Sequence, residues 1–367
     1  MDPLTSSVDL SMIPLAPNPN GDPPNFINPP SLAPTFLGVG ISFITLSVIS
    51  VSIRIFTYLK AVGKLHLDDY LCLFGLIGGV AYWSLAYSLG AQGTARHSWD
   101  VPAILLNASF LKRQTAAQVI SAPTVWAVKT SMLAFYIRVF ENVRWLRITC
   151  YTFIGLAVPF YWSNVVLPFI FCIPYNGAQW DTALFAKCAQ TAPATLVIGA
   201  FTVVIDIALF VIPIPVLAKL NLSATTKRGL FPVFLAGFLI LITSVIGLAY
   251  RVIITTNKSS DPLWDGNNVS ITAFVEVFGT VIISCTPSVS AFWHKYMSSG
   301  RLSHNFSHML TRPNKPKGES GEDPLCIPSD HHLVQESNEY AGIHAMNKSI
   351  AISQMNSRRD EAAWASV

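Results

Sequence analysis

The sequence predicts an all-α polytopic membrane protein, a bundle of seven transmembrane helices with its N-terminus outside and its C-terminus in the cytosol. Of the 367 residues 51% are hydrophobic and 12% are charged, and the mean hydropathy is +0.46. Soluble domains contain about 25% charged residues. A soluble protein of this composition would expose large apolar patches. The second observation is that the apolar residues fall into long blocks, and the third is that basic residues collect on alternate sides of them.

The two ends of the chain differ from its middle. Residues 1–34 are rich in Pro and Asn and contain no Lys or Arg. They lack the basic and apolar parts of a cleaved signal peptide, and we expect a disordered extracytosolic tail. The chain is polar again over residues 301–367, for which we expect a mostly disordered cytosolic tail. Residues 35–300 form the predicted membrane domain.

Seven apolar segments lie within this domain. Each is roughly 23 residues long, which suffices for a helix to cross a hydrocarbon core of about 30 Å. Helices are expected because an open sheet would leave backbone groups without hydrogen bonds in lipid. The segments are 35–57, 69–91, 117–140, 148–171, 194–217, 230–253 and 269–293.

Basic residues near the segment ends predict the orientation. The side expected to be cytosolic, by the positive-inside rule, carries Arg54, Lys60, Lys64, Arg138, Arg144, Arg147, Lys219, Lys227, Arg228, Lys295 and Arg301. The opposite side has fewer, namely Arg96, Lys112, Arg113, Lys187, Arg251 and Lys258. Since these cations lie in short loops between apolar blocks, they set the topology, and nucleic-acid binding is not expected.

Two kinds of motif agree with this orientation. Three Asn-x-Ser acceptors for N-glycosylation, at Asn107, Asn257 and Asn268, fall in loops predicted to lie outside. Cys172 and Cys188 flank the fourth loop, also outside, where oxidising conditions permit a disulfide.

Four ionisable residues stand out within the predicted spans. Such residues are costly in a membrane and rarely face lipid, so each is a candidate site residue. Lys129 and Asp206 lie near the middle of their segments, and Arg251 and Glu276 lie toward the outer ends of theirs. Opposite charges at similar depth predict two pairs, Lys129 with Asp206 and Arg251 with Glu276.

These pairs have a structural and a functional interpretation. They can simply hold helices together, or they can form the polar floor of an outward-opening ligand pocket. The expected aromatic walls of that pocket are Tyr161, Trp162, Phe201 and Phe274. Catalysis would require an unpaired carboxylate, for which Asp206 and Glu276 are the candidates.

A second charged group is predicted at the cytosolic face, where Arg54, Asp68, Asp69, Arg138 and Arg144 should approach one another. Asp68 and Asp69 open the second segment, where carboxylates cap free N–H groups and favour the positive end of the helix dipole. Capping explains the two aspartates adequately. The alternative is an ionic latch whose opening signals to the cytosol.

The sequence lacks the residues that several kinds of chemistry require. Retinal would need a lysine within the last segment for a Schiff base, and residues 269–293 contain none; Lys295 lies past it. No cofactor is expected. No CxxC pair suggests a metal site, and no phosphate-binding loop, HExxH motif or nucleophile elbow is present in the sequence.

An ordered set of motifs resembles the fungal rhodopsin-domain integral membrane proteins, which include a satratoxin-cluster membrane protein and surface-sensing receptor-like proteins. The resemblance covers residues 35–300. Its motifs are LHLDDYLCLFG, KTSMLAFYIRVF, FCIPYNGAQWD followed by Cys188, DIALFVIPIPVLAKLNLSATTKRGL and ISCTPSVS.

This resemblance implies a seven-helix fold, no retinal, and a place among secondary-metabolite gene clusters. Residues 1–34 lack the cysteines of the receptor-like branch's extracellular domain. We expect a multi-pass protein of the plasma membrane or an endomembrane that handles or senses an amphipathic small molecule, a hydrophobic metabolite. The alternatives are an orphan receptor with a cytosolic signalling partner and a membrane-bound cyclase or isomerase using Asp206 or Glu276. A transporter is a more distant alternative.

Overall fold

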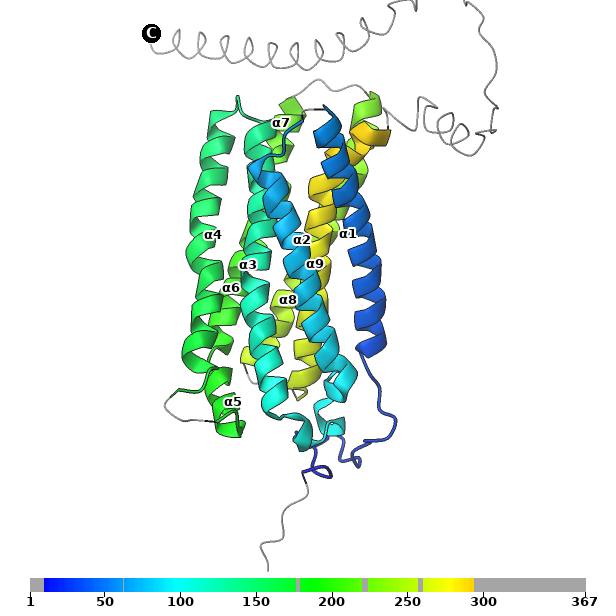
Figure 1. Cartoon of the computed structure of the whole chain (residues 1–367), viewed down its shortest axis with the longest axis vertical. Helices are drawn as coiled ribbons and strands as arrows, with labels where there is room; N and C mark the ends of the chain where they lie inside the picture. Colours follow the sequence, from blue (N-terminus) through cyan, green and yellow to red (C-terminus); the bar gives the residue numbers. More distant parts are fainter. Residues whose placement is uncertain (1–9, 62, 176–178, 220–223, 257–259, 294–367) are drawn as a thin grey trace, which may run out of the picture.

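The computed structural model describes residues 10–61, 63–175, 179–219, 224–256 and 260–293. Within them, seven long helices run side by side in one bundle (Figure 1). They are α1 (Ala33–Ala61), α2 (Leu67–Leu89), α3 (Ala108–Val139), α4 (Arg144–Phe171), α6 (Ala192–Val211), α8 (Ala224–Thr255) and α9 (Pro262–Phe292). Shorter elements are η1 (Gly90–Thr94), η2 (Ser98–Asp100), η3 (Ala103–Leu105), α5 (Thr182–Ala189) and α7 (Pro213–Lys219).

The bundle has the surface of a membrane protein. Six helices combine the length and the apolar composition of membrane spans. Large apolar side chains on their outer faces are exposed, as expected for contact with lipid tails, among them Ile41, Phe74, Ile77, Val166 and Leu239. The prediction of an all-helical, multi-pass membrane protein is confirmed. Such a protein contacts the lipid bilayer.

The remaining long helix, α3, is not among these six. It is less apolar because it lies inside the bundle. It has 32 residues, about 48 Å at 1.5 Å per residue, and is long enough to cross. It packs against α2, α4, α6 and α9. Its polar residues Thr124, Lys129, Thr130 and Ser131 are buried in protein instead of facing lipid. An interior helix does not need the hydropathy of a lipid-facing one.

The bundle has two distinct ends. The described chain begins at the end that carries α5, drawn at the bottom of Figure 1, and finishes with α9 at the end that carries α7. We call these the N-terminal end and the α7 end. An odd number of crossings therefore separates the first and last described residues. Which end faces the cytosol stays a prediction.

The N-terminal segment differs from the predicted disordered tail. Residues 10–32 follow the loop over residues 95–104, with backbone hydrogen bonds from Leu15 N to Val101 O (3.1 Å) and from Leu32 N to Ala95 O (2.8 Å). Asn25 N also donates to Asp100 Oδ1 at 2.8 Å. Pro-rich chain cannot form a helix, but its remaining backbone groups find partners in the loop. Residues 1–9 and the predicted tail over 301–367 lie outside the described residues.

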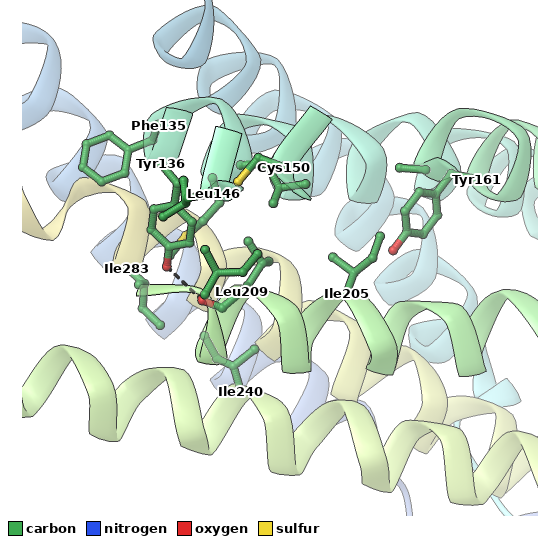
Figure 2. Packing of buried hydrophobic residues seen from close by; sticks show 13 residues of the cluster. Phe135, Tyr136, Leu146, Cys150, Tyr161, Ile205, Leu209, Ile240 and Ile283 are labelled. Atoms are coloured by element: carbon green, nitrogen blue, oxygen red, sulfur yellow. Dashed lines mark hydrogen bonds between the residues drawn. The ribbon is translucent and has the colours of Figure 1, made fainter. Parts of the chain in front are cut away.

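A proline break separates α6 from α7. Pro213 has no N–H, so it cannot donate to the carbonyl of Leu209 four residues earlier. The hydroxyl of Tyr136, on α3, donates to that carbonyl instead at 3.0 Å (Figure 2). A buried tyrosine thus satisfies the backbone group that the proline leaves free.

Two apolar cores fill the bundle. The first lies between α3, α4, α6 and α8 and includes Leu133, Leu146 and Ile205 (Figure 2). The second lies between α1, α2, α3 and α9 and includes Phe36 and Phe278. The charged residues described next lie beside these two cores.

Candidate functional site

Three charged side chains from three helices meet inside the bundle. Lys129 on α3 is 1% exposed, and its ammonium group forms an ion pair and a hydrogen bond with Asp206 on α6. The same Nζ lies 2.8 Å from Glu276 Oε1 on α9. Ser244 of α8 donates a further hydrogen bond to Asp206. We call Lys129, Asp206 and Glu276 the central triad; it holds one cation between two carboxylates.

The predicted pair between Arg251 and Glu276 is wrong. Glu276 has Lys129 as its counter-charge, because α3 lies between α6 and α9 and the lysine reaches both carboxylates. Among the described residues Arg251 has no ion pair, and it lines a cavity that also reaches Glu276. Glu276 Oε1 is buried without a hydrogen bond in the described structure.

The cavity has two adjacent chambers that share part of their lining. The outer chamber has a volume of about 250 Å³ and the inner one about 70 Å³. Tyr82, Ser121, Asn164, Ile198 and Arg251 line both. Since the outer chamber is also lined by the first residue of α6 and the last of α8, it lies at the N-terminal end of the bundle. Glu276 lines the inner chamber, which therefore leads toward the central triad.

The chamber walls are mostly small, polar and aliphatic side chains with two tyrosines, Tyr82 and Tyr161, and only Tyr161 was among the predicted aromatic lining. Tyr161 does line the inner chamber, with its hydroxyl 3.1 Å from Thr202 Oγ1. Trp162 is 44% exposed on the outer face of α4. Phe201 packs against the first core and stacks on Phe160, and Phe274 is fully buried in the second core. Sequence position gave the depth of these rings but not the direction in which they point.

The polar lining comes largely from amides and hydroxyls. Gln118 Nε2 donates to Asn164 Oδ1 at 3.3 Å across the wall between α3 and α4. The other uncharged polar residues of the outer chamber are Tyr82, Gln114, Ser121, Thr195, Thr255 and Ser270. Nothing in the apolar pattern of the sequence singles these residues out, because each is uncharged and occurs within a mainly apolar helix.

A buried ionic cluster occupies the α7 end. Arg54 is 1% exposed, and its guanidinium donates to Asp69 at 2.7 Å, to Asp68 at 2.5 Å and to the carbonyl of Ser284 at 2.6 Å. Arg138 forms a second ion pair with Asp68 at 2.9 Å. The cluster joins α1, α2, α3 and α9.

Three further details of this ionic cluster stand out. Asp69 also accepts a hydrogen bond from the backbone N–H of His66 at 2.8 Å, so it caps α2 as well as pairing with arginine. Tyr58, which the sequence did not single out, accepts from Arg138 at 2.6 Å. Arg144, predicted to belong to the cluster, is exposed at the start of α4 and has no ion pair within the described residues.

The residues predicted to lie outside the membrane differ in their exposure and in the elements to which they belong. Cys172 and Cys188 form a disulfide with Cα atoms 4.6 Å apart, joining the end of α4 to α5. Asn107 is exposed and caps α3 by accepting from Phe110 N. Asn268 lies half-buried within α9, and Asn257 lies outside the described residues. Glycosylation of these residues stays a prediction.

No metal site appears in this part of the chain: the described residues contain no group of three or more His, Cys, Asp or Glu side chains placed to bind an ion. The arrangement instead offers charges, amides and hydroxyls around a cavity. Such a site can bind and orient a small polar or amphipathic molecule.

Fold and site together define a polytopic helical membrane protein with a charge-bearing cavity between its helices. Residues 53–295 match the family model of the fungal rhodopsin domain, and the chain belongs to this family.

Two relatives place the chain more closely. It is 25% identical over 237 residues to a SAT4 family membrane protein of Emericella nidulans, which covers 62% of this chain and 59% of that protein. It is 27% identical over 262 residues to the polyenoic acids biosynthesis gene cluster protein Ba17b of Metarhizium anisopliae, covering 66% of this chain and 69% of that protein. The chain thus spans about three fifths (59%) of the first relative's length.

Proposed function

We propose that this protein is a membrane component of a fungal secondary-metabolite pathway that binds an amphipathic small molecule between its helices. The observation that carries the proposal is the two-chambered cavity, which has at its wall an arginine with no ion pair among the described residues, and a buried carboxylate at its inner end. Apolar cavities with a few convergent polar groups are the usual form of small-molecule sites.

The lining favours binding over a role in packing alone. Its residues come from α2, α3, α4, α6, α8 and α9, so a bound molecule would contact most of the bundle at once. A cavity that only tolerated loose packing would be apolar and would not expose an arginine. The charged residues at its wall cost free energy in a membrane, which a ligand could offset.

The pathway part of the proposal is supported by one relative. The Metarhizium anisopliae protein is named for a polyenoic acids biosynthesis gene cluster. A related role for this chain would bring it into contact with the amphipathic products or precursors of such a pathway.

A receptor-like function is the second candidate, because one specific feature favours it. The ionic cluster at the α7 end joins α1, α2, α3 and α9, and the last three of these also line the cavity at the opposite end. Movement of these helices around a ligand would therefore strain the ion pairs. The cyclase alternative has less support, since Lys129 contacts both candidate proton donors, Asp206 and Glu276.

The proposal is tested by metabolite profiling of a strain that lacks the gene. We expect at least one metabolite to fall, and the wild-type gene to restore it. Ser121→Trp should fail to restore it, because Ser121 lines both chambers and the indole would fill them. The matched control is Ser52→Trp, which places the same ring on an exposed position of α1. An unchanged profile in the deletion strain, or full restoration by Ser121→Trp, would contradict the proposal.

A further inference from the structure

We infer that the ligand of this cavity carries a carboxylate and that Arg251 binds it, an inference that rests on the proposed function. Arg251 is the charged residue among the described residues that line the outer chamber. The ligand class follows from three observations. These are how the Arg251 side chain is held, which of the charged residues near it have ion-pair partners, and the size of the chamber.

A glycine makes room for the Arg251 side chain. A Cβ atom added to Gly199, on α6, would lie 2.9 Å from Arg251 Cδ and 3.4 Å from one of its terminal nitrogens. A Cβ atom added to Gly247, one turn earlier on α8, would meet Thr272 Oγ1 first, at 2.8 Å, and would be in ordinary contact with the same arginine nitrogen at 3.5 Å. The arginine therefore lies in a slot between two helices, and the end of that slot is the chamber. Its position is set by packing, since its guanidinium has no hydrogen-bond acceptor among the described residues.

The pairing of nearby charges leaves Arg251 open to an anion. Glu276, the carboxylate that lines the inner chamber, lies 2.8 Å from Lys129, which it shares with Asp206. Arg251 has no such partner within the described residues. The planar guanidinium offers two parallel N–H groups that match a carboxylate. The first residue of α6, Ala192, also lines the chamber, and the N-terminal end of a helix favours negative charge.

The chamber size limits the ligand to a small acid. Its volume of about 250 Å³ exceeds the roughly 150 Å³ of an engineered protein cavity that binds benzene. It is below the roughly 300–1,000 Å³ of sites for drug-sized ligands. Ala117, Ile198, Ile254 and Val269 supply aliphatic walls beside the arginine. An aliphatic monocarboxylic acid of short or medium chain length fits this combination of one cation and a narrow apolar wall.

The test measures equilibrium binding of radiolabelled octanoate to the purified full-length protein in nanodiscs. Unlabelled octanoate, octanol and octylamine serve as competitors. We expect octanoate to displace the label at concentrations about tenfold to a hundredfold lower than octanol, the factor expected from a charged hydrogen bond. Octylamine should be the weakest competitor. This comparison needs no variant and does not depend on whether a mutant folds.

Variants then assign the preference to Arg251. Arg251→Gln should remove the difference between octanoate and octanol, and Arg251→Lys should keep part of it. The matched control is Arg113→Gln, a basic residue of α3 at the same end that donates to Gln92 and to the Ser109 carbonyl and does not line the chambers. It should leave the preference unchanged. A preference that survives in Arg251→Gln would overturn the inference.

A cavity-filling variant separates failure of the inference from failure of the proposed function. If octanol competes as well as octanoate and Ser121→Trp removes the binding of both, the carboxylate assignment is wrong and the cavity remains a ligand site. If neither compound binds in a displaceable manner, or if Ser121→Trp leaves the binding intact, the small-molecule function fails together with the inference.

Discussion

At the scale of single residues, buried charges dominate the energetics of this protein. Lys129 lies between two carboxylates in the middle of the bundle, and Arg54 donates to three acceptors at the α7 end. A buried ion pair adds little stability compared with an apolar substitute, but removing one partner is strongly destabilising because the other charge is left alone. The number of charged partners that a residue has therefore decides how much stability its substitution removes.

Lys129→Met should lower the free energy of unfolding by about 3–5 kcal/mol, because two buried carboxylates lose their cation. Adding Asp206→Asn should restore only part of this loss, since Glu276 is still unpaired. Adding Glu276→Gln as well should restore most of it. Thermal unfolding in detergent measures all three variants, with Lys60→Met, which removes an exposed ammonium group, as the control. Full recovery in the double variant would show that Glu276 does not share the lysine.

Arg54→Lys should also destabilise the protein, by about 2 kcal/mol or more, although the charge is kept. An ammonium group cannot reproduce the planar set of hydrogen bonds to Asp68, Asp69 and the Ser284 carbonyl. Arg144→Lys at the exposed start of α4 should change stability by less than about 0.5 kcal/mol. Equal melting temperatures for the two variants would contradict this account of the ionic cluster.

At the scale of helices, close contact between α2 and α3 depends on small residues. A Cβ atom added to Gly75 would lie 2.3 Å from Cγ2 of Val128, and one added to Gly78 would lie 2.3 Å from Thr124 Oγ1. Small residues allow membrane helices to approach closely where apolar burial alone gives little driving force. The position of α3, and hence of Lys129, follows from this contact.

Gly75→Ala should therefore cost about 1–3 kcal/mol, the usual range for overpacking. Val128 is β-branched and stiff in a helix, so its methyl group cannot easily turn aside. Val128→Ala in the same chain should recover much of the loss. Gly155→Ala on α4, where an added Cβ meets nothing within 4 Å, is the matched control. The measurement is again thermal unfolding, and a loss that Val128→Ala leaves unchanged would exclude this contact as the cause.

The disulfide acts at the same scale, because it ties α5 to the end of α4. Cys172 and Cys188 are separated by 16 residues, for which the chain-entropy model gives about 3 kcal/mol of stabilisation. We expect the double variant Cys172→Ser/Cys188→Ser to melt at a lower temperature. In the wild-type protein both thiols should react with maleimide after reduction and not before. Labelling without reduction would show that the bridge is absent.

At the scale of the whole molecule, an odd number of crossings places the two ends of the described chain at opposite ends of the bundle. The excess of Lys and Arg then predicts that the α7 end is cytosolic. A tag at the N-terminus should be protected from protease added to the cytosolic side, and a tag at the C-terminus should be removed. Cleavage of the N-terminal tag would reverse the orientation or change the number of crossings.

The sequence by itself determined the class of protein and the approximate place of each helix. Length and apolarity along the chain are local properties, so the segment 148–171 corresponds closely to α4 (Arg144–Phe171). The segments 117–140 and 269–293 underestimate α3 (Ala108–Val139) and α9 (Pro262–Phe292). Both helices extend into polar sequence that hydropathy does not detect, where Asn107 and Asp261 cap their first turns.

The tertiary structure alone decided which residues meet. Counting residues from the segment ends gives depth, and depth was enough to suggest that Lys129 and Asp206 lie at one level. It could not show that Glu276 joins them while Arg251 lines a cavity, or that Trp162 points toward lipid. The rotation of each helix about its axis is set by contacts such as Gly75 against Val128, which join residues far apart in the sequence. The site therefore depends on packing between helices, a property that no single segment contains.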